Sequence, residues 1–448
     1  MTFAIPENIT EIVGRIRAAG FRALPVGGCV RDLLRGKTPH DWDITSSATP
    51  DELLKIFEGC RIAPLSNGGI KHGTVTVIID RQPIEITTFR CDGEYSDGRR
   101  PDSVGFSREL SDDLCRRDFT INALCIDEQG EIVDMFGGRD DLEKGIIRAI
   151  GDPDKRFYED SLRILRALRF AAAFGFEIEP ATAESMHKNI DRLELIAAER
   201  ISDELTKLIC APDFLRIALQ YKDILCKVLP ELAPMIGLYQ RQDYHCFDVY
   251  DHTMHTVAHI RPDPLLRLTM LLHDVGKPVC SNNGHFFRHE QVGAEMAEDI
   301  LKRLNCGKAK RERIVKLIDR HSIPIPTDRL KIKKLLAKYG DETVLQLLEV
   351  KRADNMAKRE NVVAERIPLI DKTIAEVKEI MNEKPPLTLR QLAVSGNDLM
   401  DLGFAPGPLM GKVLNEMLES VVAEQLKNDK QTLLDFAKAK ITEGEQHG

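Results

Sequence analysis

The chain has 448 residues, of which 43% are hydrophobic and 30% charged, and its formal net charge is −8. This length predicts two to four domains, and the composition is typical of a helix-rich protein with real hydrophobic cores. The acidic balance excludes a general attraction to nucleic acid or to an anionic membrane, so a nucleic-acid partner would need local basic patches.

The ten cysteines are scattered and form no CxxC pair. Such spacing is typical of reduced thiols in a cytosolic protein and not of a disulfide framework or a zinc ribbon. The sequence contains no apolar run of 18 residues, and its N-terminus lacks a basic-then-apolar signal pattern. We therefore expect a cytoplasmic location and no membrane partner.

The predicted elements change character along the chain. Residues 9–20 have apolar side chains at helical spacing, and residues 42–45, 73–80 and 83–89 are β-rich, with a hairpin turn expected at Arg81–Gln82. From about residue 153 the pattern becomes almost wholly helical. This order predicts an α+β fold, in which a small N-terminal mixed sheet with helices precedes an all-α region.

The segment "TPHDWDIT" (38–45) places Asp41 and Asp43 one residue apart in a predicted strand. On a strand the two side chains project from one face, about 7 Å apart. Like charges at that spacing become stable if they share a pair of Mg²⁺ ions. Glu85, flanked by Ile84 and Ile86, is the candidate third carboxylate from a neighbouring strand. The alternative is a set of solvent-facing strand residues without a metal.

Two further segments suit a nucleotide. "PVGGCVRDLL" (25–34) is a strand end, a Gly27–Gly28 turn and a helix start, where backbone N–H groups and Arg31 favour an anion. "DLCRRDFTINAL" (113–124) supplies guanidinium groups for phosphate and a carboxylate for ribose hydroxyls. The alternative for the second segment is a helix N-terminus capped by Asp118.

Five motifs in register resemble the class II CCA-adding tRNA nucleotidyltransferase and bacterial poly(A) polymerase family, in its bacterial type with an HD domain. They are "GGCVRDLLRGKTPHDWDIT" (27–45), "RRDFTINAL" (116–124), "DMFGG" (134–138), "EDSLRILRALRF" (159–170) and "ERISDEL" (199–205). The resemblance implies a polymerase β-like nucleotidyltransferase head (1–148), a helical neck that recognises the base (149–238), an HD domain (239–365) and a helical tRNA-binding tail (366–448).

The resemblance also implies roles for residues at matching positions. Asp41 and Asp43 would hold catalytic Mg²⁺, and Glu85, inferred from its place in the strand pattern, would be the third catalytic carboxylate beside them. The nucleotide would be bound by Gly27, Gly28, Arg31, Arg117, Asp118, Asn122, Glu159, Asp160, Arg163 and Arg166. "DMFGG" would be the hinge between head and neck.

The chemistry of base recognition agrees with this implication. Asp160 and Arg163 are three residues apart on a predicted helix and would be neighbours there. A carboxylate acceptor beside a guanidinium donor can pair with the edge of cytosine, and a small rotation could suit adenine. The alternative is a surface ion pair.

Residues 89–110 predict a mobile loop like that of CCA-adding members, with Arg90, Tyr95, Asp97, Arg99, Arg100 and Pro101 as its matching positions. The loop favours full CCA addition over A-only addition, without excluding an A-adding or poly(A) polymerase relative. Two rivals of other classes are an HD phosphohydrolase with a regulatory nucleotide-binding head and a non-catalytic RNA-binding protein.

A second constellation lies further along the chain. His252, His255 and His259 fall on one face of a predicted helix, and His273–Asp274 ends another helix. The order H…HD…D resembles the HD phosphohydrolase superfamily, which implies His252, His273, Asp274 and Asp354 as ligands of a second divalent metal. His289 and His321 could bind a further metal or a substrate phosphate. The alternative is histidines that only pack or cap.

The remaining segments favour tRNA as the partner. Residues 306–321 and 328–340 are locally basic helices, and 394–418 contain a Gly-Pro-rich turn that resembles the segment for the tRNA elbow in bacterial CCA enzymes. The sequence thus predicts a transferase that builds or repairs the 3′-terminal CCA of tRNA from CTP and ATP, with a possible HD phosphohydrolase activity. No obligate protein partner is evident.

Overall fold

The computed structural model describes residues 3–63, 73–92, 104–241, 243–282, 285–326 and 328–445. The chain forms two compact units, one of Met1–Pro230 with Arg303–Asn305 and one of Glu231–Lys302 with Cys306–Gly448. The mixed α+β class expected from the sequence is confirmed, with strands concentrated in the first unit. Within the described ranges, no helix is both long enough and apolar enough to cross a membrane.

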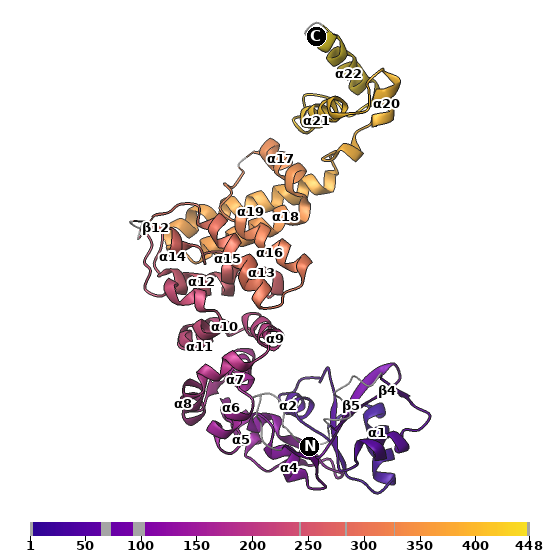
Figure 1. Cartoon of the computed structure of the whole chain (residues 1–448), viewed down its shortest axis with the longest axis vertical. Helices are drawn as coiled ribbons and strands as arrows, with labels where there is room; N and C mark the ends of the chain where they lie inside the picture. Colours follow the sequence, from indigo (N-terminus) through magenta and orange to yellow (C-terminus); the bar gives the residue numbers. More distant parts are fainter. Residues whose placement is uncertain are drawn as a thin grey trace. The chain divides into compact units, whose positions relative to one another are not determined.

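A five-stranded mixed sheet forms the core of the first unit (Figure 1). The neighbouring strands β2 and β5 run parallel, and the other pairs are antiparallel. In spatial order the strands are β1 (Ala23–Pro25), β2 (Asp43–Ser46), β5 (Gln82–Thr88), β4 (Thr74–Ile79) and β3 (Arg61–Ile62). A parallel β2–β5 pair places the start of β2 beside the middle of β5.

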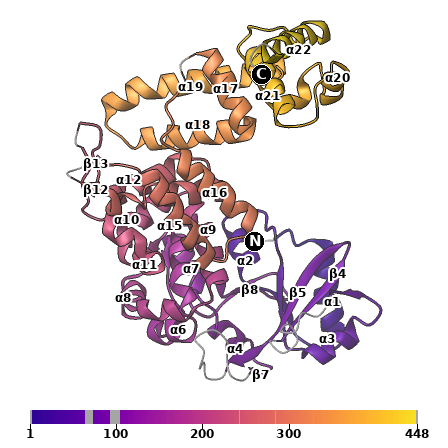
Figure 2. The same cartoon turned by 45° about the horizontal axis from the view of Figure 1, so that its top comes forward.

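Two helices cover one face of this sheet, as Figure 2 shows for α1 (Glu7–Ala18) and α3 (Pro50–Ile56). Their buried apolar side chains, such as Ile12 and Leu53, join strand residues such as Val75 in one core cluster. The face with alternating apolar residues is therefore the core face, and the polar residues between them point away from it.

The hairpin between β4 and β5 turns one residue earlier than expected. The register pairs Ile79 with Gln82, and the two turn residues are Asp80 (φ 51°) and Arg81 (φ 65°). Positive φ at both positions is the geometry that matches the twist of a two-residue hairpin. The predicted turn at Arg81–Gln82 is corrected accordingly.

Short elements complete the part of the first unit before residue 148. Two two-stranded ribbons accompany the sheet, and an isolated bridge between Val26 and Cys125 ties β1 to one of them. These elements are α2 (Gly28–Leu34), β6 (Arg90–Asp92), β7 (Val104–Phe106), α4 (Leu110–Cys115), the 3-10 turn η2 (Thr120–Asn122), β8 (Leu124–Ile126), β9 (Ile132–Asp134) and α5 (Gly138–Lys144).

The rest of the first unit is helical apart from a small parallel ribbon. The two strands of this ribbon run parallel, and their register pairs Ile146 with Glu177 and Ile147 with Ile178. The elements are β10 (Ile146–Ile147), α6 (Pro153–Glu159), α7 (Leu162–Phe174), β11 (Glu177–Ile178), α8 (Pro180–Lys188), η3 (Ile190–Leu195), α9 (Ala198–Ile209), α10 (Phe214–Gln220) and α11 (Lys222–Val228).

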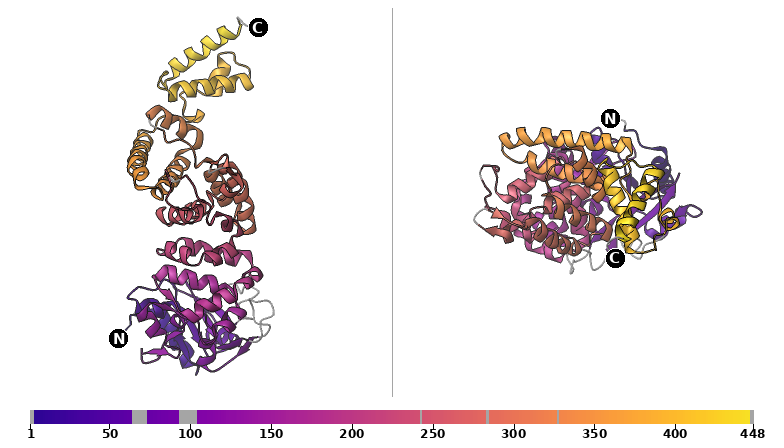
Figure 3. Two further views of the ribbon diagram at one scale, coloured as in Figure 1. Left: turned by 90° about the vertical axis from the view of Figure 1, so that its left-hand side faces the viewer. Right: turned by 90° about the horizontal axis from the view of Figure 1, so that it is seen from above.

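The second unit is built from helices, with one small ribbon. The longest, α19, has 24 residues and is the long orange helix in Figure 3. The elements are η4 (Pro230–Met235), α12 (Val249–His259), α13 (Pro264–Leu272), α14 (Lys277–Cys280), β12 (Ser281–Asn282), β13 (His285–Phe286), α15 (His289–Arg303), α16 (Lys308–Arg320), α17 (Arg329–Tyr339), α18 (Asp341–Met356), α19 (Glu360–Glu383), η5 (Leu389–Gln391), α20 (Gly396–Asp401), α21 (Pro408–Val422) and α22 (Lys430–Glu445).

Candidate functional site

Two carboxylates meet across the parallel strand pair. Asp43 opens β2, and the register sets it opposite Glu85 of β5. Both residues are exposed, whereas Ile44, Ile84 and Ile86 beside them are buried in the core. The alternation along each strand therefore directs both acids to the polar face of the sheet, as the sequence predicted for Glu85.

Asp41 does not share the strand. Because β2 begins at Asp43, the expectation that Asp41 and Asp43 project from one strand face is wrong. Asp41 is exposed in the bend before β2, and its charge still acts on both other carboxyls. The three acids are brought together from a bend and two strands.

The electrostatics of this cluster favour a cation. Desolvation by the surrounding protein atoms raises the pKa of Asp43, and Asp41 raises it further, although Arg117 opposes both. Desolvation also raises the pKa of Glu85, with added repulsion from Asp43 and Asp41. In the described part of the chain the three carboxylates form no side-chain ion pair, so their mutual repulsion is left for a divalent ion to relieve.

The carboxylates are, however, more widely spaced than a compact metal cage. Among the described residues, three potential ligand atoms lie within 4.8 Å of one another only in the second unit. Oxygen-only ligands nevertheless suit Mg²⁺, which usually keeps several waters and is held by one or two carboxylates together with substrate phosphates. The donor set thus fits an ion that binds along with a nucleotide.

The Gly27 turn brings backbone close to a guanidinium. Gly27 has φ +81°, donates its N–H to the Leu124 carbonyl at 2.9 Å, and a Cβ there would lie 3.0 Å from Arg117 Nη1. A Cβ on Gly28 would make only an ordinary 3.6 Å contact with Arg31 Nη2. Position 27 therefore requires glycine, whereas position 28 has room for a residue with a Cβ.

Arg31 is buried and already has protein partners. Its Nη1 donates to Asn122 Oδ1 at 2.6 Å, its Nε donates to Asp32 at 2.9 Å, and its guanidinium lies 4.8 Å from the Phe174 ring centroid. The structure thus brings together Arg31 and Asn122, which the sequence predicted as separate nucleotide contacts.

Asp118 anchors a chain of charged groups that runs into α7 and α9. Its Oδ1 accepts from Asn122 at 3.0 Å, and its Oδ2 accepts from Arg166 Nε and Nη2 at 2.8 and 2.6 Å. Burial alone would raise the pKa of Asp118, but Arg166 and Asn122 hold it well below its usual range. Arg166 also lies 3.5 Å from the buried Glu204, which pairs with Arg169 at 2.8 Å.

Asp160 and Arg163 do not lie on one helix as expected, and they do not form the alternative ion pair with each other. Helix α6 ends at Glu159 and α7 begins at Leu162, so Asp160 lies in the break and not on one helix with Arg163. Arg163 Nη1 donates to Glu159 at 3.0 Å, while both oxygens of Asp160 accept from Arg200, at 3.2 and 2.7 Å. Sequence reasoning missed Arg200, although it lies within the "ERISDEL" motif.

"DMFGG" forms a capped turn. Asp134 accepts from the backbone N–H groups of Phe136, Gly138 and Arg139 at the start of α5. A Cβ on Gly138 would lie 2.1 Å from the Thr120 carbonyl oxygen, which leaves room only for glycine. Its role as a hinge stays a prediction.

Half of the loop expected at residues 89–110, namely 93–103, falls outside the described residues. Arg90 is part of β6, while Tyr95, Asp97, Arg99, Arg100 and Pro101 fall outside the described residues.

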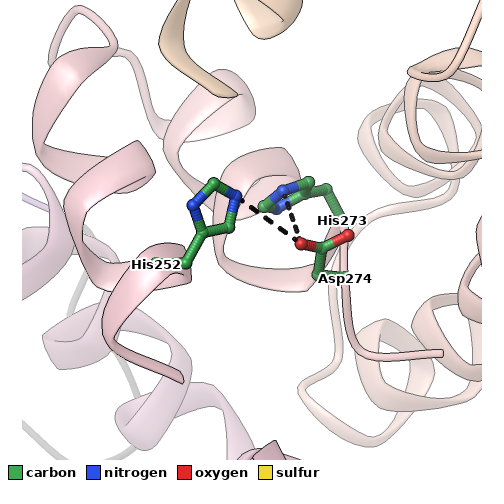
Figure 4. Close-up of side chains that lie close together, drawn as sticks. All are labelled: His252, His273 and Asp274. Atoms are coloured by element: carbon green, nitrogen blue, oxygen red, sulfur yellow. Dashed lines mark ion pairs between the residues drawn. The ribbon is translucent and has the colours of Figure 1, made fainter. Parts of the chain in front are cut away.

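In the second unit, His252, His273 and Asp274 converge from α12 and the end of α13 (Figure 4). Asp274 Oδ2 lies 3.2 Å from His273 Nε2 and 3.8 Å from His252 Nε2. All three side chains are buried, and neither His273 Nε2 nor Asp274 Oδ1 has a hydrogen-bond partner among the described residues. Buried polar atoms aimed at one point without partners suit a bound metal ion.

The other predicted ligands surround this group. Asp354 Oδ1 lies 3.1 Å from His252 Nε2, and Asp274 Oδ1 lies 3.6 Å from His289 Nε2 and 3.9 Å from His321 Nε2. The second set, Asp274 with His289 and His321, also has its ligand atoms within 4.8 Å of one another. The structure therefore brings together every residue that the sequence proposed for this centre, with Asp274 shared between two sets.

His255 and His259 do not join the cluster. His255 stacks on Phe247 with ring centroids 4.2 Å apart, and His259 is exposed at the end of α12. Of the three histidines on this helix, only His252, the one proposed as a ligand, belongs to the cluster. Near this cluster, the backbone at Gly276 packs closely against the backbone at Gly293. A Cβ on Gly276 would lie 2.6 Å from the backbone nitrogen of Gly293.

The comparisons with known proteins now identify the family. A model of the poly A polymerase head domain matches residues 23–148, one of the RNA- and SrmB-binding site of polymerase A matches 175–236, and one of tRNA nucleotidyltransferase domain 2 matches 286–437. The CCA-adding enzyme of Streptococcus gordonii is 34% identical over 97% of this chain and 98% of its own length. The chain belongs to the CCA-adding enzyme family.

Other relatives agree with this placement. The CCA-adding enzyme of Limosilactobacillus fermentum is 35% identical over 96% of both chains. The crystal structure of the Bacillus stearothermophilus CCA-adding enzyme in complex with CTP has a TM-score of 0.75 and 28% identity, and the match covers 99% of this chain and 100% of that one. The family resemblance and the nucleotidyltransferase class predicted from the sequence are confirmed.

Proposed function

We propose that this chain adds the 3′-terminal CCA of tRNA from CTP and ATP, with the head carboxylates as the catalytic centre. The observation that carries the proposal is the Asp43–Glu85 pair beside Asp41, a set of like charges that forms no ion pair with any described side chain and lies next to the Gly27 turn. A chain that only bound RNA would gain nothing from three repelling carboxylates at one point.

In this mechanism the tRNA 3′-hydroxyl attacks the α-phosphate of the nucleotide in line, and pyrophosphate leaves. A divalent cation held by Asp41 and Asp43, proposed to be Mg²⁺, would neutralise the phosphate charge and lower the pKa of the attacking hydroxyl. Arg117, beside Gly27, supplies guanidinium donors for the phosphates. The bend, the turn and the arginine together orient the triphosphate.

The sugar and base contacts extend from the same network. Asp118 and Asn122 are proposed to face the ribose, with Arg166 fixing the carboxylate from α7. Asp160 and Arg163 are proposed to read the base, and their present partners are Arg200 and Glu159. Nucleotide binding then exchanges internal partners for the edge of the base.

The experiment uses three tRNA transcripts, ending before the first C, after C and after CC, each incubated with CTP and ATP and then sequenced at the 3′ end. We expect all three to finish as CCA. Addition of A alone to the CC-ended tRNA would show a half-enzyme, and long A tails would show a poly(A) polymerase. No incorporation at all would overturn the proposal.

A second candidate function, metal-dependent phosphohydrolysis, is favoured by the cavity beside the histidine cluster. This cavity of about 410 Å³ is lined by Asp274, Asp354 and the cations Arg241, Lys277 and Lys358. Buried histidine and carboxylate ligands next to cationic side chains suit a metal-activated attack on a phosphate ester. We propose His252, His273, Asp274 and Asp354 as ligands of this second divalent metal.

Metal analysis tests the second candidate. The purified full chain should carry about one or two divalent ions, the number that two ligand sets sharing one aspartate can hold. His252→Ala should lower that content, whereas His255→Ala, on the same helix but stacked on Phe247, should not. No metal under supplementation with Mn²⁺, Co²⁺, Ni²⁺ or Zn²⁺ would reduce the cluster to a packing role.

We further propose that the four regions expected from the sequence are functional divisions within the two units. The basic helices α16 and α17 and the Gly407–Pro408 start of α21 are proposed to contact tRNA phosphates. Because tRNA and nucleoside triphosphates are cytoplasmic substrates, we propose that the enzyme acts there.

A further inference from the structure

Asp113 is a fully buried carboxylate beside the proposed catalytic strand, and sequence reasoning gave it no role. It lies on the last turn of α4, and both its oxygens are occupied. Oδ1 accepts from Arg116 Nε at 3.0 Å, and Oδ2 accepts from Arg117 Nη2 at 3.1 Å and from Thr45 Oγ1 at 3.0 Å. One carboxylate thus joins two arginines to β2.

These contacts fix Arg117 in a particular place. Thr45 is two residues after Asp43 on β2, so Asp113 ties Arg117 to the strand that carries the catalytic carboxylate. On its other side, Arg117 Nη1 lies against Gly27, where a Cβ would come within 3.0 Å. A guanidinium held by a carboxylate on one edge and by a close backbone on the other has little rotational freedom.

Arg117 has further N–H donors, on Nε and Nη1, that do not bond to Asp113. Arg117 Nε is buried, and within the described part of the chain neither Nε nor Nη1 makes a hydrogen bond. A buried donor without an acceptor destabilises the folded protein, so such a group indicates a missing partner. The Gly27 turn beside it is the proposed place of the nucleotide phosphates.

We propose that Asp113 is a positioning residue for nucleotidyl transfer, which holds Arg117 so that its unpaired donors meet the phosphates of the incoming nucleotide. The proposal rests on the phosphate-binding role of the Gly27 turn and Arg117 given above. Asp113 itself touches neither the nucleotide nor the metal. Its effect is transmitted through Arg117 and, at the strand, through Thr45.

Asp113→Asn separates this role from simple packing. Asparagine has the same shape but a single acceptor oxygen, so it can serve Arg116 or Arg117 but not both. We expect KM for CTP and for ATP to rise by the same factor, about tenfold, since a lost charge-assisted hydrogen bond of about 1.4 kcal/mol corresponds to that factor. The Kd for tRNA should stay unchanged. Asp112→Asn is the matched control, because Asp112 is the neighbouring acid and accepts from Ser107 instead.

A double-mutant cycle supplies the readout that a structural role would not produce. In an Arg117→Ala background, Asp113→Asn should raise KM for the nucleotides no further, since the group it positions is gone. An equal rise in both backgrounds, or an unchanged KM in the single variant, would overturn the proposal. If Asp113→Asn fails to fold, Thr45→Val removes a donor to Asp113 without changing charge, and its smaller KM rise should likewise vanish in the Arg117→Ala background.

The activity of the parent enzyme distinguishes a failure of the positioning role from a failure of the proposed function. If the parent adds CCA and the cycle is additive, only the role of Asp113 is overturned. If the parent incorporates neither C nor A, the proposed function fails, and the positioning role fails with it.

Discussion

The buried Asp118–Arg166 pair offers the most direct test of the charged network in the first unit. In Asp118→Asn, the amide Oδ1 can still accept from Asn122 and from the Phe119 N–H, as the carboxylate does at 3.0 and 2.8 Å. The amide nitrogen, however, faces the two donors that Arg166 directed at Oδ2. The variant therefore removes the ion pair while leaving the local turn in place.

The size of the effect follows from these contacts. Two hydrogen bonds to a charged group contribute about 1.5–3 kcal/mol each, and truncating one partner of a buried pair costs about 3–5 kcal/mol. Arg166 keeps a second acid at 3.5 Å in Glu204, and its side chain is 32% exposed, so water and Glu204 recover part of the loss. We expect the free energy of unfolding to fall by about 2–4 kcal/mol.

The assay uses a probe that the sequence provides. Trp42 is the only tryptophan of the chain, and it packs against the core of the first unit beside the sheet, so its fluorescence in a urea titration reports on that unit. Asp140→Asn is the matched control, because Asp140 and Lys144 form a surface pair 3.8 Å apart. An exposed pair contributes at most about 1 kcal/mol.

The pH dependence has a defined sign. The pKa of Asp118 is held below its unfolded value of about 3.9, so its contribution is complete above that pH and is lost as the pH falls through the folded pKa. The stability difference between the parent and Asp118→Asn should therefore narrow below about pH 4. Equal destabilisation by Asp118→Asn and Asp140→Asn at pH 7 would refute the reasoning.

Other consequences follow from single positions. Asp43→Asn should abolish nucleotide incorporation, as should EDTA, and leave the Kd for tRNA unchanged. Because desolvation by neighbouring protein atoms and the charge of Asp41 raise the pKa of the Asp43 carboxyl, the variant without metal should unfold at a higher Tm than the parent at pH 7, but not at a pH below the unfolded pKa, in a thermal scan. Glu85→Gln should show the same Tm increase, and activity equal to the parent's would contradict its catalytic role. Gly27→Ala should cost about 1–2 kcal/mol in urea unfolding and weaken CTP binding, since φ is +81° and the new Cβ meets Arg117. His273→Ala should reduce bound divalent metal with no effect on CCA addition, and a loss of CCA addition would show that the second cluster stabilises the whole enzyme.

Where a strand or helix was continuous, its hydrophobic periodicity correctly predicted which side chains point toward the core and which point away from it. Glu85 lies between two buried isoleucines on a regular strand, so a period of two was sufficient to direct it outward. Periodicity could not predict that Glu85 lies opposite Asp43, because β2 and β5 are neighbours in space but not in the chain. That register depends on the packing of the whole sheet.

Periodicity failed where an element ended or where distance along its axis mattered. Residues 159–170 have apolar spacing that fits one helix, yet Asp160 has φ −143° and ψ 98°, which separates α6 from α7. His252 and His259 fall on one helical side, but seven residues are about 10 Å along an α-helix, too far for both to bind one ion. Arg200 was missed because a salt bridge between distant segments leaves no local pattern. Asp113 is different: its partners Arg116 and Arg117 lie three and four residues along the chain, a spacing that could have indicated both ion pairs, and only its hydrogen bond with Thr45 is long-range.

These pairings change how nucleotide choice should be understood. The two groups proposed to read the base are not vacant: Asp160 is held by Arg200, and Arg163 by Glu159. A base that approaches must therefore offer hydrogen bonds at least as good as those it displaces, and an exchange of partners yields only a small net free energy. Discrimination between cytosine or adenine and other bases then depends on the competing internal partners as much as on the reading groups. We therefore propose that Arg200 and Glu159 influence base specificity through their pairings with Asp160 and Arg163.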